Sequence, residues 1–166
     1  MDDVKYLLRA VDVSKRSVRE GNHPFGSVLV DSEGNVLLEQ TNIEVTESDC
    51  TGHAETALMR QASKQYDKDF LATCTLYTTA EPCSMCAGAM YWANVKRLVY
   101  GITEKQLLAE TGDDPRNPTL SLDCRTVFSA GQKKIEVVGP VPDVAEAVLQ
   151  PHKNYWTQQT PAPSES

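Results

Sequence analysis

Three residues in two short segments have the types and the spacing of a catalytic metal site. Cys83 and Cys86 are three positions apart, directly after Pro82, and residues at this spacing share one side of a helix. The amino terminus of a helix also favours thiolates, through its unpaired N–H groups and the positive end of its dipole. With His53 they offer one nitrogen and two sulfurs, which Zn²⁺ accepts in tetrahedral geometry with one position left for water. The open position predicts a catalytic site rather than a structural one.

A fourth protein ligand is the main alternative for this site. Cys50 lies three residues before His53, and the other candidates are Cys74, Cys124, His23 and His152. The chain has five cysteines, an odd number, and its first residues lack the apolar core of an export signal. These features favour reduced thiols over a disulfide framework. We expect none of these residues to be a fourth ligand, which leaves one position of the metal site open.

Glu55 is the candidate proton carrier. It follows His53 by two residues at the expected start of a helix, where it can reach the open position without binding the metal. Zinc lowers the pKa of its water to about 7, and a nearby carboxylate can accept that proton and pass it to a leaving amine. The alternative is an ordinary solvated glutamate on a helix.

The elements that position these residues follow from hydrophobic periodicity and turn residues. Helices are predicted over 2–20, from about 52 through 62, from 82 to about 93, over 103–110 and over 143–155, with Pro151 breaking or kinking the last turn. Strands are predicted over Gly26–Val30 and Val36–Thr41, as a hairpin, and over 75–79, 95–100 and 135–138; residues 112–118 form a loop. The alternation of strands and helices after the hairpin predicts a three-layer α/β/α fold. A helix between the last two strands predicts that these strands pair in parallel.

Length and charge limit what the chain binds. Its 166 residues fit one domain, expected over 1–156, and the Pro-, Ser-, Thr- and Gln-rich tail at 157–166 is expected to be disordered. The net charge is −7 and no Lys/Arg cluster exceeds a pair, so nucleic acid binding is not expected. No apolar run is long enough to cross a membrane. We expect a cytoplasmic protein with a small, soluble substrate.

These residues resemble the cytidine deaminase-like superfamily, and look nearest to the branch of guanine deaminases, tRNA adenosine deaminases and fungal cytosine deaminases. His-x-Glu followed by Pro-Cys-x-x-Cys is the signature of zinc deaminases. The resemblance spans about residues 5–155 and includes the segments 24–26, 51–55, 76–79, 81–90 and 97–101, together with Asn42. It implies a cytidine deaminase-like fold with a five-stranded mixed sheet, one Zn²⁺ per subunit, and a homodimer or larger assembly.

The resemblance also implies contacts with the substrate ring. The ring would lie against His53 and Phe25, and Asn42 would hydrogen-bond it. Backbone N–H groups at Ala54 and near Cys83 would help to orient base and water. The alternatives are a core aromatic for Phe25 and a turn residue for Asn42.

Three further contacts are implied at the rim of the pocket. Trp92 would form part of the wall, and Asp114, or its neighbour Asp113, would handle the leaving amino group. Tyr155 and Trp156 resemble the carboxy-terminal aromatics that close the pocket in guanine deaminases, sometimes by exchange between subunits. A buried structural tryptophan and a turn-capping aspartate are the alternatives.

The leading hypothesis is a hydrolytic deaminase of a free nucleobase or related aminoheterocycle, in which activated water attacks the amino-bearing ring carbon. Guanine, converted to xanthine and ammonia, is the first candidate. Residues 115–132 depart from the guanine deaminase pattern, which places the departure in the loop expected to contact the substrate. The other hypotheses are a tRNA wobble-adenosine deaminase, a cytosine or nucleoside deaminase, and a zinc-stabilised binding domain without catalysis.

Overall fold

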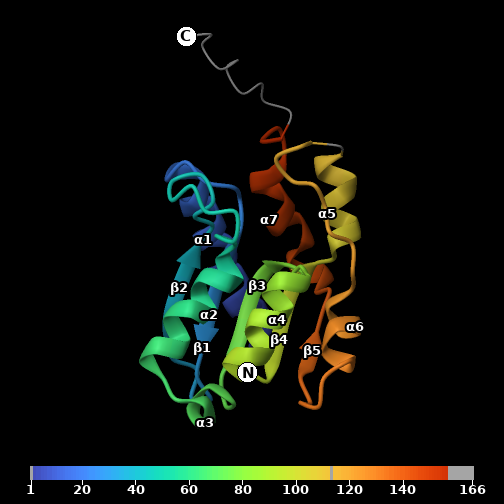
Figure 1. The fold of residues 1–166 in the computed structure, drawn as a ribbon. Helices are drawn as coiled ribbons and strands as arrows, with labels where there is room; N and C mark the ends of the chain where they lie inside the picture. The colour runs from blue at the N-terminus through green and yellow to red at the C-terminus, as the bar shows by residue number, and fades with distance from the viewer. Residues whose placement is uncertain (1, 113, 157–166) are drawn as a thin grey trace.

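The central sheet combines the predicted hairpin with three later strands (Figure 1). The structure, a computed structural model, describes residues 2–112 and 114–156. The strands lie in the order β2-β1-β3-β4-β5, with bounds β1 Gly26–Val30, β2 Val36–Thr41, β3 Thr75–Ala80, β4 Arg97–Ile102 and β5 Glu136–Val138. β1 is antiparallel to β2 and to β3, whereas β3, β4 and β5 are parallel to one another. The predicted five-stranded mixed sheet with a parallel final pair is confirmed.

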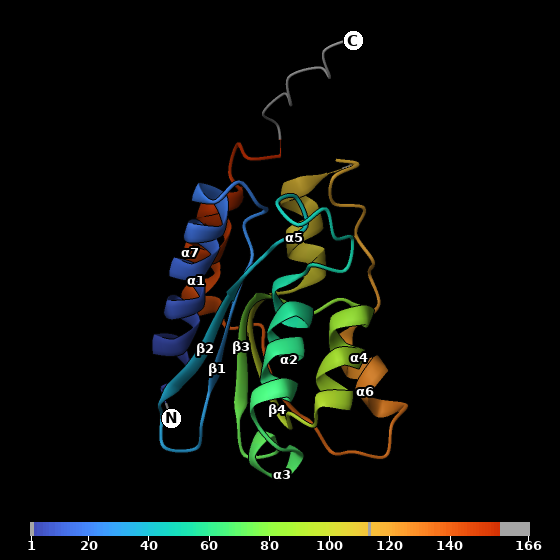
Figure 2. The same cartoon turned by 60° about the vertical axis from the view of Figure 1, so that its left-hand side comes forward.

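Helices cover both faces of the sheet, as Figure 2 shows. One face carries α1 (Asp3–Arg19) and α7 (Ala145–Leu149); the other carries α2 (Ala54–Gln65), α4 (Ser84–Ala93) and α6 (Cys124–Ser129). The short α3 (Lys68–Leu71) and α5 (Glu104–Thr111) lie at opposite ends of the sheet. Two hydrophobic clusters fill the spaces between the layers, one on each side. The three-layer α/β/α architecture is therefore confirmed.

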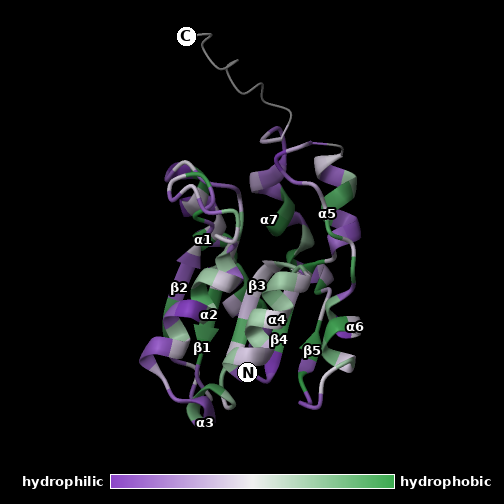
Figure 3. Ribbon diagram, in the orientation of Figure 1, coloured by the Kyte–Doolittle hydropathy of each residue, from purple (hydrophilic) through white to green (hydrophobic). Residues whose placement is uncertain are grey.

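The sheet is most deeply buried at its centre. Every residue of β1 and of β3 is buried, because helices pack on both of their faces. β2 forms an edge, and its polar end, with Glu39 and Gln40, contrasts with the apolar β1 in Figure 3. The burial of β1 (GSVLV) and β3 (TLYTTA) over their whole length is typical of central strands covered on both faces.

The sheet topology brings the carboxyl ends of β2, β3, β4 and β5 to one edge. β2 runs in the same direction as β3, because both are antiparallel to β1, and β4 is parallel to β3. The carboxyl ends of β2, β3 and β4 therefore meet, and the chain enters α2, α4 and α5 from this edge. Crevices outside the carboxyl ends of strands are the usual ligand sites of open α/β sheets.

Several predicted bounds are wrong in the carboxy-terminal half and at one helix start. The helix predicted over 143–155 is three short pieces, η1 (Pro142–Val144), α7 and η2 (Gln150–His152), because Pro151 has no N–H to continue the ladder. α4 begins at Ser84, two residues after Pro82, with Cys83 as its N-cap. The strand predicted over 95–100 lies at Arg97–Ile102, and the short helices α3 and α6 were not predicted.

Gly26 gives a test of the packing between β1 and α1. A Cβ at this position would overlap the backbone oxygen of Ala10 and lie 2.5 Å from the backbone nitrogen of Ser14. Gly26→Ala should therefore destabilise the chain by about 1–3 kcal/mol, the usual cost of overpacking. Because about 1 kcal/mol corresponds to about 2–4 °C at this length, thermal unfolding should show a Tm lowered by several degrees.

The matched control for this substitution is Gly88→Ala in α4. A Cβ there meets nothing within 4 Å, and alanine is the better helix former, so the Tm should stay the same or rise. An unchanged Tm for Gly26→Ala would show that α1 and β1 are not packed as closely as described.

Candidate active site

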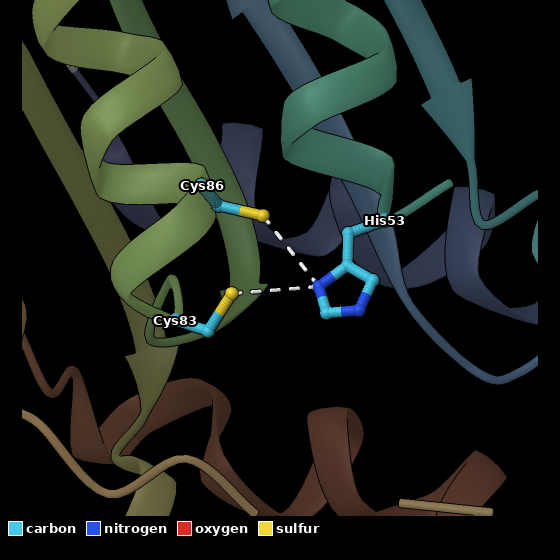
Figure 4. Close-up of side chains that lie close together, drawn as sticks. All are labelled: His53, Cys83 and Cys86. Atoms are coloured by element: carbon cyan, nitrogen blue, oxygen red, sulfur yellow. Dashed lines mark hydrogen bonds between the residues drawn. The ribbon is translucent and has the colours of Figure 1, made fainter. Parts of the chain in front are cut away.

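The three predicted metal ligands come together where α2 and α4 begin. His53 is the N-cap residue of α2, Cys83 is the N-cap residue of α4, and Cys86 lies in the first turn of α4. Figure 4 shows the imidazole and the two thiols pointing toward one another. Nδ1 of His53 lies 3.5 Å from Sγ of Cys83 and 3.6 Å from Sγ of Cys86.

These distances fit zinc. Bonds of about 2.0–2.1 Å to nitrogen and 2.3 Å to sulfur, at the tetrahedral angle, separate the two donors by about 3.6 Å. Cys50 is exposed and does not belong to this cluster, which contains no fourth His, Cys, Asp or Glu among the described residues. His53, Cys83 and Cys86 would thus hold the ion and leave one position open.

Mutual contacts shift the pKa values of all three ligands. The contact with Cys83 raises the pKa of His53 to about 9. A hydrogen bond from Cys86, followed by the contact with His53, lowers the pKa of the Cys83 thiol. Cys86, which gives that hydrogen bond and is buried, has a raised pKa. Metal binding here must displace protons, as is usual for His/Cys sites.

Glu55 is not a solvated helix residue. It is 6% exposed, and its Oε1 accepts hydrogen bonds from Thr78 Oγ1 at 2.6 Å and from Ser27 Oγ at 3.2 Å. Ser27 and Thr78 are register partners on β1 and β3, so the sheet itself fixes these two donors. Burial raises the pKa of the Glu55 carboxyl, which makes it a better proton acceptor.

The roles of Ser27 and Thr78 were not predicted. Both lie inside strands, and their contact with Glu55 depends on the antiparallel register of β1 and β3. Thr78 belongs to one of the segments that carry the family resemblance, which was the one available signal.

A cavity of about 470 Å³ opens beside these groups. The predicted contacts Phe25, Asn42 and Ala54 line it together with His53 and Glu55. Its far wall is the loop from Pro115 to Leu120, part of the stretch that departs from the guanine deaminase pattern. This volume is typical of sites for small molecules.

The cavity is rich in carboxylates. Glu44, Glu55, Glu81 and Glu104 line it, whereas Arg116 is the one arginine or lysine among the described lining residues. The carboxylate of Glu81 accepts the backbone N–H groups of Glu104 and Cys124, at 3.2 Å and 3.0 Å. Burial and nearby negative groups raise the pKa of Glu104 to about 8. Glu44, Glu81 and Glu104 were not among the predicted site residues.

Arg116 is already paired within the chain. Its Nη2 lies 2.7 Å from Oδ2 of Asp114 and donates to the carbonyl oxygen of Trp156 at 2.6 Å. The guanidinium also lies over the rings of Tyr155 and Trp156. Arg116 therefore ties the loop of the cavity wall to the carboxy-terminal segment.

The remaining predicted contacts do not line the cavity. Trp92 is 71% exposed near the far end of α4, in a surface groove with Met59 of α2, because α4 runs away from the site. Asp114 binds Arg116 rather than facing the cavity, and Asp113 lies outside the described residues.

The carboxy-terminal aromatics lie behind the cavity wall. The hydroxyl of Tyr155 lies 2.8 Å from Nδ1 of His23, and Trp156 is buried. The ring of Phe25 packs against His152 and, less closely, Trp156. These aromatics support Phe25 within one chain. The predicted exchange between subunits stays a prediction.

The chain belongs to the family defined by the cytidine and deoxycytidylate deaminase zinc-binding region, whose model matches residues 1–102. A probable cytosine deaminase of Schizosaccharomyces pombe is 37% identical over 154 residues, 93% of this chain and 92% of the relative. Guanine deaminase of Bacillus subtilis is 40% identical over 115 residues, which cover 69% of this chain and 72% of the relative. A solved structure from studies of A-to-I editing by tRNA:A34 deaminases superposes with a TM-score of 0.62 at 25% identity, covering 83% of this chain and 98% of the other.

The family confirms the zinc site and a hydrolytic deaminase reaction. It does not single out one substrate, since these three relatives are named for cytosine, guanine and tRNA adenosine. Among the described helices, none has the length and hydrophobicity to span a membrane.

Proposed function

We propose that this chain deaminates an uncharged free nucleobase or a related aminoheterocycle. The observation that carries the proposal is the acidic cavity, with four carboxylate side chains in its lining and its one described arginine already paired with Asp114. A phosphorylated nucleotide would bring its negative charge next to the carboxylates of Glu44 and Glu81, and the one arginine of the described lining is already paired with Asp114. A neutral ring meets no such penalty.

The described residues provide the proton transfers of the reaction. When bound by His53 and the two cysteines, zinc supplies Lewis acidity that lowers the pKa of water. Glu55 accepts one proton from the water that adds to the amino-bearing ring carbon and delivers it to the ring nitrogen. It then takes the remaining hydroxyl proton of the adduct and delivers it to the departing amine. The C–N bond breaks, ammonia leaves and a carbonyl remains. Thr78 and Ser27 keep the Glu55 carboxylate in place during both transfers.

Guanine remains the first substrate to test, and cytosine is the second. Phe25 and Asn42 line the cavity, in agreement with the ring contacts implied for the guanine deaminase branch. The ion pair of Asp114 with Arg116, however, engages the acid that would handle the leaving amino group of guanine. Cytosine is favoured by the relative from S. pombe, which matches nearly the whole chain.

A substrate panel tests this proposal. Ammonia release should be measured with guanine, cytosine, adenine, 2-aminopurine and isoguanine, with their nucleosides, and with the matching 5′-monophosphates. We expect turnover of at least one free base, with kcat/KM for its monophosphate lower by about 100-fold or more, which is about 2.7 kcal/mol. Equal turnover of base and monophosphate would contradict the proposal, as would inosine formation in a tRNA anticodon loop with no activity on any free base.

A further inference from the structure

Glu44 connects the metal centre with the substrate side of the cavity. A single carboxylate oxygen, Oε1, accepts a hydrogen bond from Nδ2 of Asn42 at 2.9 Å and lies 3.3 Å from Nε2 of His53. Glu44 also lines the cavity. No pattern in the sequence pointed to this residue.

The contact with His53 controls which ring nitrogen carries the proton. Nδ1 faces the two sulfurs, so a neutral imidazole that binds metal there keeps its hydrogen on Nε2. That nitrogen is the one beside Glu44. A carboxylate at this position favours the required tautomer, fixes the orientation of the ring and makes Nδ1 a stronger ligand.

The contact with Asn42 fixes the orientation of an amide at the cavity wall. Nδ2 donates to Oε1 of Glu44, while Oδ1 accepts the backbone N–H of Glu44 at 3.0 Å. Asn42 is 1% exposed, so little else can reorient its side chain. Because an amide nitrogen carries two hydrogens, one remains for a ring in the cavity.

The backbone around Glu44 is held by other groups. Asn22 Oδ1 accepts the backbone N–H groups of Val45 and Thr46, and Ile43 donates to the carbonyl of Gly52. The loop therefore does not depend on the Glu44 carboxylate for its conformation, which leaves that carboxylate to its two contacts.

We propose that Glu44 is a positioning residue that orients the zinc ligand His53 and the ring-binding amide of Asn42 through one shared oxygen. The effect on the metal rests on the geometry of His53 alone. The effect on substrate rests on the proposed nucleobase specificity.

The test compares Glu44→Ala and Glu44→Gln with Glu47→Gln, an exposed glutamate of the same loop. Zinc affinity, measured by competition with a chromogenic chelator, should fall about 10–100-fold in Glu44→Ala. It should fall less in Glu44→Gln, which keeps a carbonyl acceptor, and not at all in Glu47→Gln. The absorption spectrum of the cobalt-substituted protein should shift in Glu44→Ala, because the ligand geometry changes.

At saturating zinc, Glu44→Ala should also raise KM for the free base found in the panel. Unchanged zinc affinity and an unchanged cobalt spectrum would overturn the proposal, whatever happens to the Tm. These two readouts need no substrate, so a failure of the nucleobase proposal would leave them interpretable.

Discussion

Replacing Glu55 with glutamine should lower kcat by about 100- to 10,000-fold, the usual contribution of a general acid and base. The glutamine side chain has nearly the same shape as glutamate. Its amide oxygen can still accept the hydrogen bond that Thr78 Oγ1 donates to Oε1 of Glu55, at 2.6 Å, in the unchanged protein. It cannot take up the proton of the attacking water. Zinc content should stay close to that of the unchanged protein, because Glu55 is not part of the His53, Cys83 and Cys86 cluster.

Steady-state kinetics together with metal analysis distinguish a lost proton carrier from a lost metal. Glu55→Ala should be as inactive as Glu55→Gln. It should also be less stable than the unchanged protein, because the buried hydroxyls of Thr78 and Ser27 would lose their acceptor. Glu47→Gln serves as the control and should keep full activity. Normal turnover by Glu55→Gln would remove the mechanism proposed for this site.

Cys86→Ala should lose both zinc and activity. Cys86 is fully buried beside Nδ1 of His53, and its removal leaves one nitrogen and one sulfur, too few ligands for a stable tetrahedral zinc site. Metal analysis after dialysis against a mild chelator should show near-stoichiometric zinc in the unchanged protein and almost none in the variant. Cys83→Ala should behave in the same way.

The control for these variants is Cys50→Ser. Cys50 lines the cavity but lies outside the ligand cluster, so its removal should leave zinc bound. Zinc loss in this variant would indicate a closed, four-ligand site and would contradict catalysis at an open position. Full zinc retention by Cys86→Ala would mean that the ligands are wrongly assigned.

Local patterns were sufficient for the parts of the fold that build the metal site. The hairpin strands have the predicted bounds, because the turn residues at 32–35 clearly separate two strand-forming segments. The starts of α2 and α4 follow from the His53 and Cys83 segments to within two residues. The His-x-Glu and Pro-Cys-x-x-Cys motifs together were enough to predict that His53, Cys83 and Cys86 form one cluster.

The cavity wall was not predictable in the same way. Arg116 finds its partners in Asp114 and in the carbonyl of Trp156, forty residues later, and no periodicity signals such a contact. Trp92 was wrongly placed in the wall because a motif gives a position along a helix but not the helix direction relative to the site. Glu44 was missed because His53 becomes its neighbour only when the loop after β2 folds back onto the start of α2.

The residues that line the cavity come from two separate parts of the chain. Phe25, Asn42, Glu55 and the metal ligands all lie within residues 1–102, which match the family profile, whereas the wall from Pro115 to Leu120 lies beyond it. The groups that cleave the bond thus lie within the family profile, whereas part of the wall on the substrate side lies outside it. A substitution in residues 115–120 therefore alters the substrate side of the cavity while leaving the proton carrier and the metal ligands in place.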